Sequence, residues 1–534
     1  MQHILLRNIG LELSLFLLLA GPVYSQPEST PMKCGFSAQH VVEGVERTQA
    51  LQVDRLETQH HYLTRDSRFL IHYDTEGVNA VDPTSTIVQG IPDWIIETEL
   101  ALEKSFSLLA DSLGFDEPPM DTYEYPQDPP GGAYDIYFRN WNYYGMTYFP
   151  EHIGLPGKPD AHAGYMVFEN DFVGGFNTHG VSALQVTIAH ELFHLFHLGY
   201  RGPKPGENFP SETWLYELTS SWFENVAYPE VDDYVYYVKT YFNSPAPLDG
   251  GYSLVGYRSA HYGDILSDYG EPALWEQIWE NFITDSAYAA IDKGLRNIAG
   301  VDFADSYRQF AGWNLLTGTR AISGFGYADA EKFPEIATDG PISIPDSLPF
   351  SVGLERRGVS YLDVFHGNDS PEFYQMEFSG SSSSVGGAWA FPGQTLALEY
   401  FQADQSRGMS LNNPYYNGVM AIANPMDNQG NIRIIQKRRI LRIFPNPYIP
   451  AEHGNFLRLY TILPPDKTPE LTLYNLLGQK IGYWQFTELS GQEGPTTINV
   501  SMDTPAIREL GSGVYFFQLE TGRDSKSAKF TLLR

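Results

Sequence analysis

Five residues, His190-Glu-Leu-Phe-His194, have the types and the spacing of a zinc-binding motif. Positions four apart lie on one face of an α-helix, so His190 and His194 could bind one Zn²⁺ while Glu191 reaches a metal-bound water. The flanking residues from Val181 to Leu198 are largely apolar, which favours a buried helix. Because burying these polar groups without a partner is costly, the motif predicts zinc metallopeptidase chemistry with Glu191 as general base. The alternative is a pair of satisfied core histidines beside a solvent-facing Glu191.

A catalytic zinc ion takes three protein ligands and leaves one position for water. The next predicted helix, Ser211 to Ala227, offers Glu217 and Glu224, which are seven residues apart and therefore share a face. They lie about two turns, roughly 10 Å, apart, so they cannot both reach one zinc ion at ~2 Å. One of the two is therefore the candidate third ligand, and the other would hydrogen-bond a histidine ligand or cap a buried donor.

The sequence around these helices resembles the gluzincins, in which HExxH lies on one helix and a glutamate ligand on the next. It is also similar to a group of secreted bacterial metallopeptidases that often carry a type IX secretion tail. The resemblance spans roughly residues 67 to 285 and implies that His190, His194 and Glu217 are the metal ligands. The stretches that carry it are Phe69–Thr75, Gly131–Tyr137, Val186–His194, Trp214–Glu217 and Trp222–Glu224.

Four further residues near the motif have open roles. His197, one turn beyond His194, would make the zinc structural if it were a fourth ligand; a packed or outer histidine is the interpretation that we favour. Ser221 stands where many gluzincins keep an Asp that orients a histidine ligand. Tyr257 and His261 are candidates to stabilise the oxyanion, and either could equally be a packing residue.

The N-terminal segment indicates export. Residues 1–25 have a basic start, an apolar stretch and a small-residue cleavage site, as signal peptides do, and no later stretch is long enough to span a bilayer. Cys34 is the only cysteine, so it cannot form an internal disulfide. It lies in a predicted pro-segment or N-terminal arm, residues 26–66. Its thiolate could hold the open coordination position and keep an enzyme latent, or it could be an incidental thiol.

The chain is strongly acidic, with a formal net charge of −31. This charge makes nucleic acid and anionic membranes improbable partners, and it usually reflects a solvated surface. Acidic pairs such as Asn170-Asp171 and Asp232-Asp233 could bind Ca²⁺, but no EF-hand-like spacing supports such a site.

The order of predicted elements gives the expected architecture. Strands are predicted near Phe69–Tyr73, Tyr134–Phe138 and Gly164–Glu169, and a helical segment near Tyr257–Tyr269. The resemblance to zincins implies that the last of these strands borders the cleft, where a peptide could add to it. Beyond Gly324, a proline-punctuated linker leads into short alternating strands. We therefore expect a multidomain protein: an α+β zincin-like metallopeptidase domain followed by two all-β sandwich domains. The expected boundaries are 67–325 for the first domain, 345–438 for an accessory β-sandwich and 441–534 for the last.

Residues 441–534 resemble a type IX secretion (Por-type) sorting domain, which implies the secretion machinery as a partner and a secreted or cell-surface location. The pieces that carry this resemblance are Phe444–Pro447, Leu471–Gln479, Gly511–Phe517 and Lys529–Arg534. The sequence thus predicts a secreted zinc-dependent metalloendopeptidase acting on protein or peptide substrates. The alternative is a catalytically inactive adhesion or scaffolding protein at the cell surface that keeps the peptidase fold.

Overall fold

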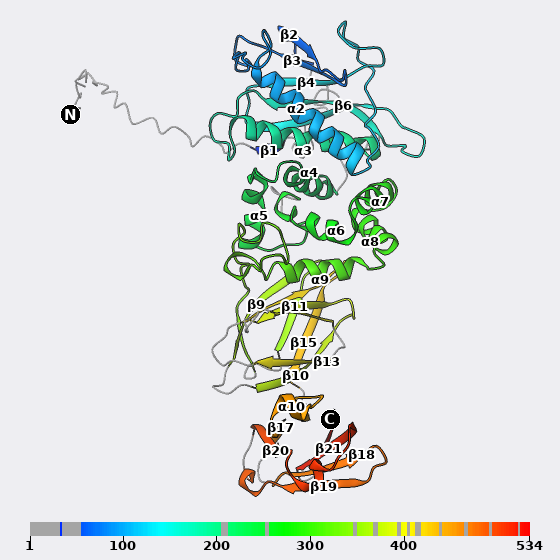
Figure 1. Ribbon diagram of the computed structural model, residues 1–534. Coiled ribbons are helices and arrows are strands. Elements are labelled where there is room, and N and C mark those ends of the chain that lie inside the picture. The colour runs from blue at the N-terminus through cyan, green and yellow to red at the C-terminus, as the bar shows by residue number, and fades with distance from the viewer. Residues whose placement is uncertain are drawn as a thin grey trace, which may run out of the picture.

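The computed structural model shows a layered molecule, with a sheet at one end, helices in the middle and further sheets toward the C-terminus (Figure 1). The predicted signal peptide and most of the predicted N-terminal arm lie outside the described residues. The described residues are 32–34, 55–203, 212–250, 256–344, 350–366, 372–391, 397–402, 406–411, 418–436, 441–463, 468–490, 494–521 and 524–534.

The first layer is a six-stranded sheet in the order β1-β5-β6-β4-β3-β2. Strand pairs β3–β4 and β4–β6 are parallel, as is the edge pair β1–β5, whereas β5–β6 and β2–β3 are antiparallel. The strand predicted to border the cleft, β6, is buried along its whole length and lies inside the sheet, so that prediction is wrong. Strand β5, which the sequence did not predict, lies between β6 and the edge strand β1. The strands are β1 (Met32–Cys34), β2 (His60–Leu63), β3 (Phe69–Tyr73), β4 (Tyr134–Arg139), β5 (Tyr143–His152) and β6 (His162–Glu169).

Helices pack on this sheet and then form a layer of their own. Helix α3 contacts β5, β6, α2 and α4, and every residue from Val186 to Tyr200 is buried, as expected of a helix that is apolar on nearly all sides. The predicted segment from residue 257 to 269 is two elements, η3 and α6. The helices are α2 (Asp93–Ser107), η2 (Leu108–Ser112), α3 (Gly180–Tyr200), α4 (Thr213–Ala227), α5 (Asp233–Asn243), η3 (Tyr257–Ser259), α6 (Tyr262–Gly270), α7 (Ala273–Phe282), α8 (Ala287–Ile298), α9 (Phe303–Trp313) and η4 (Gly318–Arg320).

Two sheets follow the helical layer, with strand orders β13-β10-β15-β8 and β12-β11-β14-β9-β7. Trp389, Phe401 and Met420 contribute to the apolar core of this region. The strands are β7 (Pro341–Ile344), β8 (Phe350–Leu354), β9 (Val359–His366), β10 (Glu372–Gly380), β11 (Gly386–Phe391), β12 (Ala397–Gln402), β13 (Ser406–Leu411), β14 (Gly418–Ala423) and β15 (Gly430–Gln436).

The last region has two sheets, β16-β17-β20 and β19-β18-β21-β22, and a core of its own that runs from Ile443 to Leu532. Because no described residue before Ile443 belongs to this core, the region has its own source of stability. Its elements are β16 (Leu441–Phe444), α10 (Pro450–His453), β17 (Phe456–Leu463), β18 (Glu470–Asn475), β19 (Lys480–Gln485), η5 (Thr487–Leu489), β20 (Gly494–Ser501), α11 (Pro505–Arg508), β21 (Gly513–Thr521) and β22 (Asp524–Leu532).

The predicted fold class, an α+β zincin-like domain followed by two all-β sandwich domains, is wrong. The first sheet is a mixed α/β arrangement, because helix α2 connects the parallel strands β3 and β4. The helical layer is also continuous with the sheet that follows. Helix α9 packs on β11 and β14, and Tyr361, Ala388 and Val419 belong to the same apolar core as the helices. The architecture is therefore a mixed α/β unit joined to several β-sheets.

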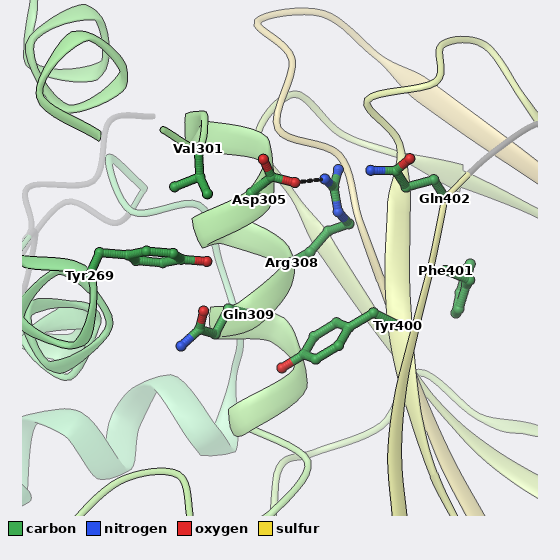
Figure 2. Close-up of a pocket in the computed structure, with 8 residues that line it drawn as sticks. All are labelled: Tyr269, Val301, Asp305, Arg308, Gln309, Tyr400, Phe401 and Gln402. Atoms are coloured by element: carbon green, nitrogen blue, oxygen red, sulfur yellow. Dashed lines mark hydrogen bonds and ion pairs between the residues drawn. The ribbon is translucent and has the colours of Figure 1, made fainter. Parts of the chain in front are cut away.

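A pocket of about 420 Å³ lies where α9 meets β12 (Figure 2). The Arg308 guanidinium at this pocket donates to Asp305 and, at 3.1 Å, to the carbonyl of Ser384. Tyr269 and Tyr400 contribute aromatic walls. Since the lining has neither histidine nor cysteine and its cation is already paired, this pocket lacks the chemistry that the HExxH motif predicts.

Within the ranges that the structure describes, no helix has both the length and the apolar character needed to cross a membrane.

Candidate metal centre

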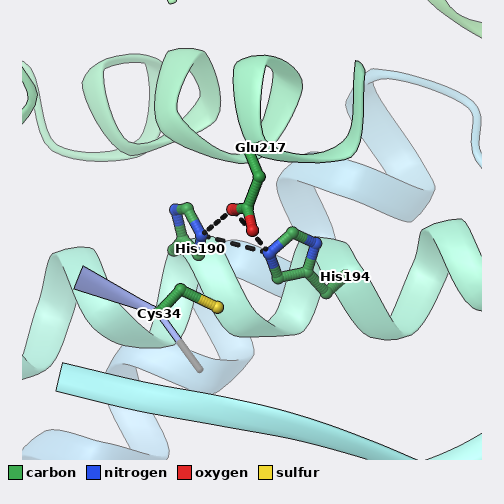
Figure 3. Close-up of side chains that lie close together, drawn as sticks. All are labelled: Cys34, His190, His194 and Glu217. Carbon is green, nitrogen blue, oxygen red and sulfur yellow. Dashed lines mark hydrogen bonds and ion pairs between the residues drawn. The ribbon is translucent and has the colours of Figure 1, made fainter. Parts of the chain in front are cut away.

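Helices α3 and α4 bring His190, His194 and Glu217 into one buried group (Figure 3). The two imidazole Nε2 atoms are 3.1 Å apart. Glu217 Oε2 lies 3.2 Å from Nε2 of His190 and 3.3 Å from Nε2 of His194. The three residues that the sequence singled out as ligands therefore point at a common centre.

These separations match those of ligands that share one small metal ion. Ligand atoms at ~2.0–2.1 Å from a tetrahedral zinc ion are about 3.3 Å from one another. Cys34 Sγ also belongs to the group, whose four ligand atoms all lie within 4.8 Å of one another. Thiolate, imidazole and carboxylate are the donor types that bind divalent transition metals. A buried group of Cys34, His190, His194 and Glu217 could thus hold a metal ion.

The electrostatics of the group call for a cation. Burial lowers the pKa of His190, but Glu217 and Glu224 outweigh this effect and raise it to about 9. Burial raises the pKa of Glu217, and the two histidines outweigh it and hold that pKa below its usual range. Without a metal, a proton on the His190 imidazole would compensate carboxylate charge, and a metal ion can replace that proton.

Residues outside the group orient both histidines. His190 Nδ1 donates to Glu224 Oε1 at 2.8 Å, which directs its Nε2 toward the centre. His194 Nδ1 lies 3.3 Å from Ser220 Oγ. Glu224, two helical turns from Glu217, therefore contacts a histidine of the group and is not itself one of the potential ligands. The hydroxyl near His194 comes from Ser220, which the sequence did not single out, because Ser221 was the position compared with an Asp.

Glu191 follows His190 in α3, and its two carboxylate oxygens differ in their contacts. Thr147 Oγ1 of β5 is 2.8 Å from Glu191 Oε2, whereas the buried Oε1 atom has no hydrogen-bond partner among the residues that the structure describes. Gly145 of β5 permits this approach, because a Cβ atom there would lie 2.8 Å from the Glu191 Cγ atom. A buried carboxylate oxygen without a hydrogen-bond partner destabilises the fold, so it calls for a functional explanation. Acceptance of a proton from water is one such function.

Of the two candidates for oxyanion stabilisation, only Tyr257 adjoins the group. Its ring stacks on His190 at a centroid distance of 5.7 Å, and its hydroxyl hydrogen-bonds Glu217. Burial, with Glu217 nearby, raises the Tyr257 pKa well above its usual value, so the phenol remains a donor. Gly256, at φ +88°, lets this loop approach α4, since a Cβ atom would lie 2.6 Å from that of Glu217.

His261 lies in a separate aromatic cluster, with ring contacts to Tyr241, Phe242 and Phe310. Burial lowers its pKa to about 3, so the ring is neutral. The sequence placed Tyr257 and His261 on one helical segment, but η3 ends before His261 and α6 begins after it. This break separates the two side chains.

His197 is packed beside the group. Its ring stacks on Trp279 at 3.9 Å, and its Nε2 lies 3.2 Å from Thr219 Oγ1. Burial and the neighbouring histidines lower the pKa of His197 well below its usual value. The group of potential ligands therefore does not include His197, although His194 is only one turn away.

The residues considered as calcium ligands pair with other groups of the protein. Asp233 pairs with Lys33 and Asp232 with Lys332. Asn170 donates to the carbonyl of Ala80, and Asp171 accepts from the Val173 amide. Neither pair belongs to a group of potential metal ligands among the residues that the structure describes.

No protein-family model and no curated protein matches the chain. Matching solved structures include an FMN-binding β-glucuronidase from Facaelibacterium prausnitzii L2-6 (10% identity, 35% of this chain and 33% of that chain, TM-score 0.15). They also include the Parabacteroides merdae β-glucuronidase (9%, 35% and 31%, TM-score 0.17) and dimeric latent PorU from Porphyromonas gingivalis (9%, 40% and 19%, TM-score 0.16). The chain thus spans about a third of each β-glucuronidase. Similarity this low carries no argument about activity and gives no support to the predicted zincin-like fold class.

The two glutamates of α4 should differ in their effect on metal affinity. Glu217→Ala should abolish tight zinc binding, whereas Glu224→Ala should weaken it by about 10- to 100-fold, as the loss of a histidine-orienting partner does. Calorimetric titration of the metal-free protein with Zn²⁺ measures both effects, and Glu230→Ala, which removes an exposed carboxylate just after α4, is the control. A stronger effect of Glu224→Ala than of Glu217→Ala would overturn the ligand assignment.

Proposed function

We propose that this chain is a zinc-dependent metalloendopeptidase. The observation that carries the proposal is the convergence of His190, His194 and Glu217 beside a buried Glu191 oxygen that has no partner. His190, His194 and Glu217 would hold the ion. When bound, zinc would supply Lewis acidity toward the scissile carbonyl and lower the pKa of a water molecule toward ~7.

The chain's own residues would then carry the proton transfers. Glu191 would accept a proton from the attacking water at Oε1 and return it to the departing amine. The Thr147 hydroxyl next to Oε2 holds the carboxylate in place for both transfers. The Tyr257 hydroxyl would turn from Glu217 to donate its hydrogen bond to the developing oxyanion, and the stacking of its ring on His190 keeps it within the group.

We place this activity outside the cell on the basis of the sequence at the two ends of the chain. The signal-peptide features lie in residues 1–25, and the tail that resembles a type IX sorting domain covers 441–534. The separate core of that tail, from Ile443 to Leu532, supports a module that an export machinery could recognise as a unit.

Replacement of Glu191 should separate metal binding from hydrolysis. Glu191→Gln keeps the shape of the side chain and touches no proposed ligand atom, so the variant should retain stoichiometric zinc while peptide cleavage falls by about 10⁴-fold or more. Casein or peptide-library cleavage before and after chelation, with metal analysis of the same samples, measures both quantities. Because Cys34 belongs to the same group and could keep the unmodified protein latent, both measurements are repeated with Cys34→Ser. If neither protein shows chelator-sensitive cleavage although both bind zinc, the adhesion or scaffolding alternative replaces this proposal.

Removal of the tail should separate folding from export. Because the last core includes none of the residues before Ile443 that the structure describes, a chain ending at Lys437 should fold and keep its zinc. In the native host it should accumulate in the periplasm, as fractionation and immunoblotting would show. Export of the truncated chain at the level of the full chain would contradict the sorting role.

A further inference from the structure

The short strand β1 lies where an extended substrate would reach the metal centre. It pairs in parallel with β5, with Met32 opposite Tyr143 and Cys34 opposite Gly145. This pairing makes β1 the edge strand of the six-stranded sheet and places it beside Glu191, since Gly145 is also the residue that approaches the Glu191 side chain. Addition of a strand to a sheet edge is a common way to bind an extended peptide.

The two described side chains of β1 are both buried in the site. Cys34 Sγ points toward the imidazoles of His190 and His194 and belongs to the group of potential ligands (Figure 3). Three ligands from α3 and α4 leave one position for water in a tetrahedral site, and a thiolate there would displace that water. Coordination by Cys34 would release the thiol proton to solvent and involves no transfer of electrons.

The Lys33 side chain occupies an acidic subsite next to the metal centre. Its Nζ donates to Glu224 Oε2 at 2.8 Å and also to Asp233, and all three side chains are almost fully buried. The rings of Tyr144 and Tyr237 lie 4.8 and 5.5 Å from Nζ. Two buried carboxylates and two aromatic rings form a subsite for a cation, and an empty one would leave both charges uncompensated.

We infer that β1 is an intramolecular inhibitor bound in the substrate site, and that the subsite holding Lys33 accepts a lysine or arginine side chain of an extended peptide substrate. Because Lys33 directly precedes Cys34, whose Sγ belongs to the metal-binding group, the basic residue of the substrate would adjoin the scissile bond. The inference rests on the proposed function, and it names both a latent state and a substrate class.

Cobalt substitution tests whether Cys34 binds the metal and closes the fourth coordination position, without any assay of activity. The metal-free full chain titrated with Co²⁺ should develop a thiolate-to-cobalt charge-transfer absorption, and Cys34→Ser should bind Co²⁺ without that band. Glu191→Gln is the matched control and should keep the band. Cobalt bound by the unmodified chain without the band would overturn the closure and leave the proposed function standing. Failure to bind cobalt at all would overturn both.

Hydrolysis measures the inhibition itself. Lys33→Ala/Cys34→Ser, which removes both side chains that β1 places in the site, should raise the rate of peptide cleavage by about tenfold or more if β1 occupies the site at least nine-tenths of the time. Addition of Glu191→Gln to this variant should abolish cleavage, which assigns the gained activity to this site. An unchanged rate in Lys33→Ala/Cys34→Ser, with cleavage still dependent on Glu191, would show that β1 does not inhibit.

Peptide binding to Lys33→Ala/Cys34→Ser/Glu191→Gln, in which the chain's own cation no longer fills the subsite, tests the subsite independently of turnover. A zinc-loaded sample should bind extended peptides with one lysine at least about tenfold more tightly than peptides with norleucine at that position, because the subsite carboxylates would otherwise lack a cation. Addition of Asp233→Asn, which keeps the side-chain shape, should reduce this difference, whereas Lys239→Ala on the exposed face of α5 should not. Equal binding of both peptides would overturn the subsite.

Discussion

The centre of the molecule depends on one electrostatic constraint: buried carboxylates need a cation. Glu191, Glu217 and Glu224 are all buried within or next to the same site, and Asp233 is buried close by. Burial of several uncompensated charges would cost more than the fold could supply. The Lys33 ammonium compensates Glu224 and Asp233, and a metal ion between the histidines and Glu217 would compensate the rest. The packing of α3, α4 and β1 around one another follows from this requirement.

Two glycines let backbone segments lie close to the glutamates of this site. Gly145 lets β5 lie against Glu191, and Gly256 lets the loop that carries Tyr257 lie against α4, where any side chain at residue 256 would collide with Glu217. The all-round burial of α3 keeps the histidines in one orientation, and Glu224 and Ser220 contact their outer nitrogens. Such rigidity is what a metal site requires, since ligand positions must be set before the metal binds.

The sequence was most informative where chemistry and helical spacing act together. His190 and His194 could be paired from their spacing alone, and the structure places Glu217 among the potential ligands and Glu224 at His190 Nδ1. Side chains from distant segments, such as Thr147 and Lys33, have no local pattern that links them to the motif. Strand β5 contains Gly145 and Pro150, which strand rules disfavour, so this strand was not predicted. The fold class was wrong because the sequence shows neither which strands pair with one another nor that the helical layer and the following sheet share a core.

The central claim is that β1, α3 and α4 together bind one metal ion, and X-ray absorption at the zinc edge tests it most directly. The unmodified full chain loaded with one equivalent of zinc should show three nitrogen or oxygen ligands at ~2.0–2.1 Å and one sulfur ligand at ~2.3 Å. These are the distances expected for His190, His194, Glu217 and Cys34. A shell of six oxygen ligands, typical of ions held loosely by surface carboxylates, would contradict the account.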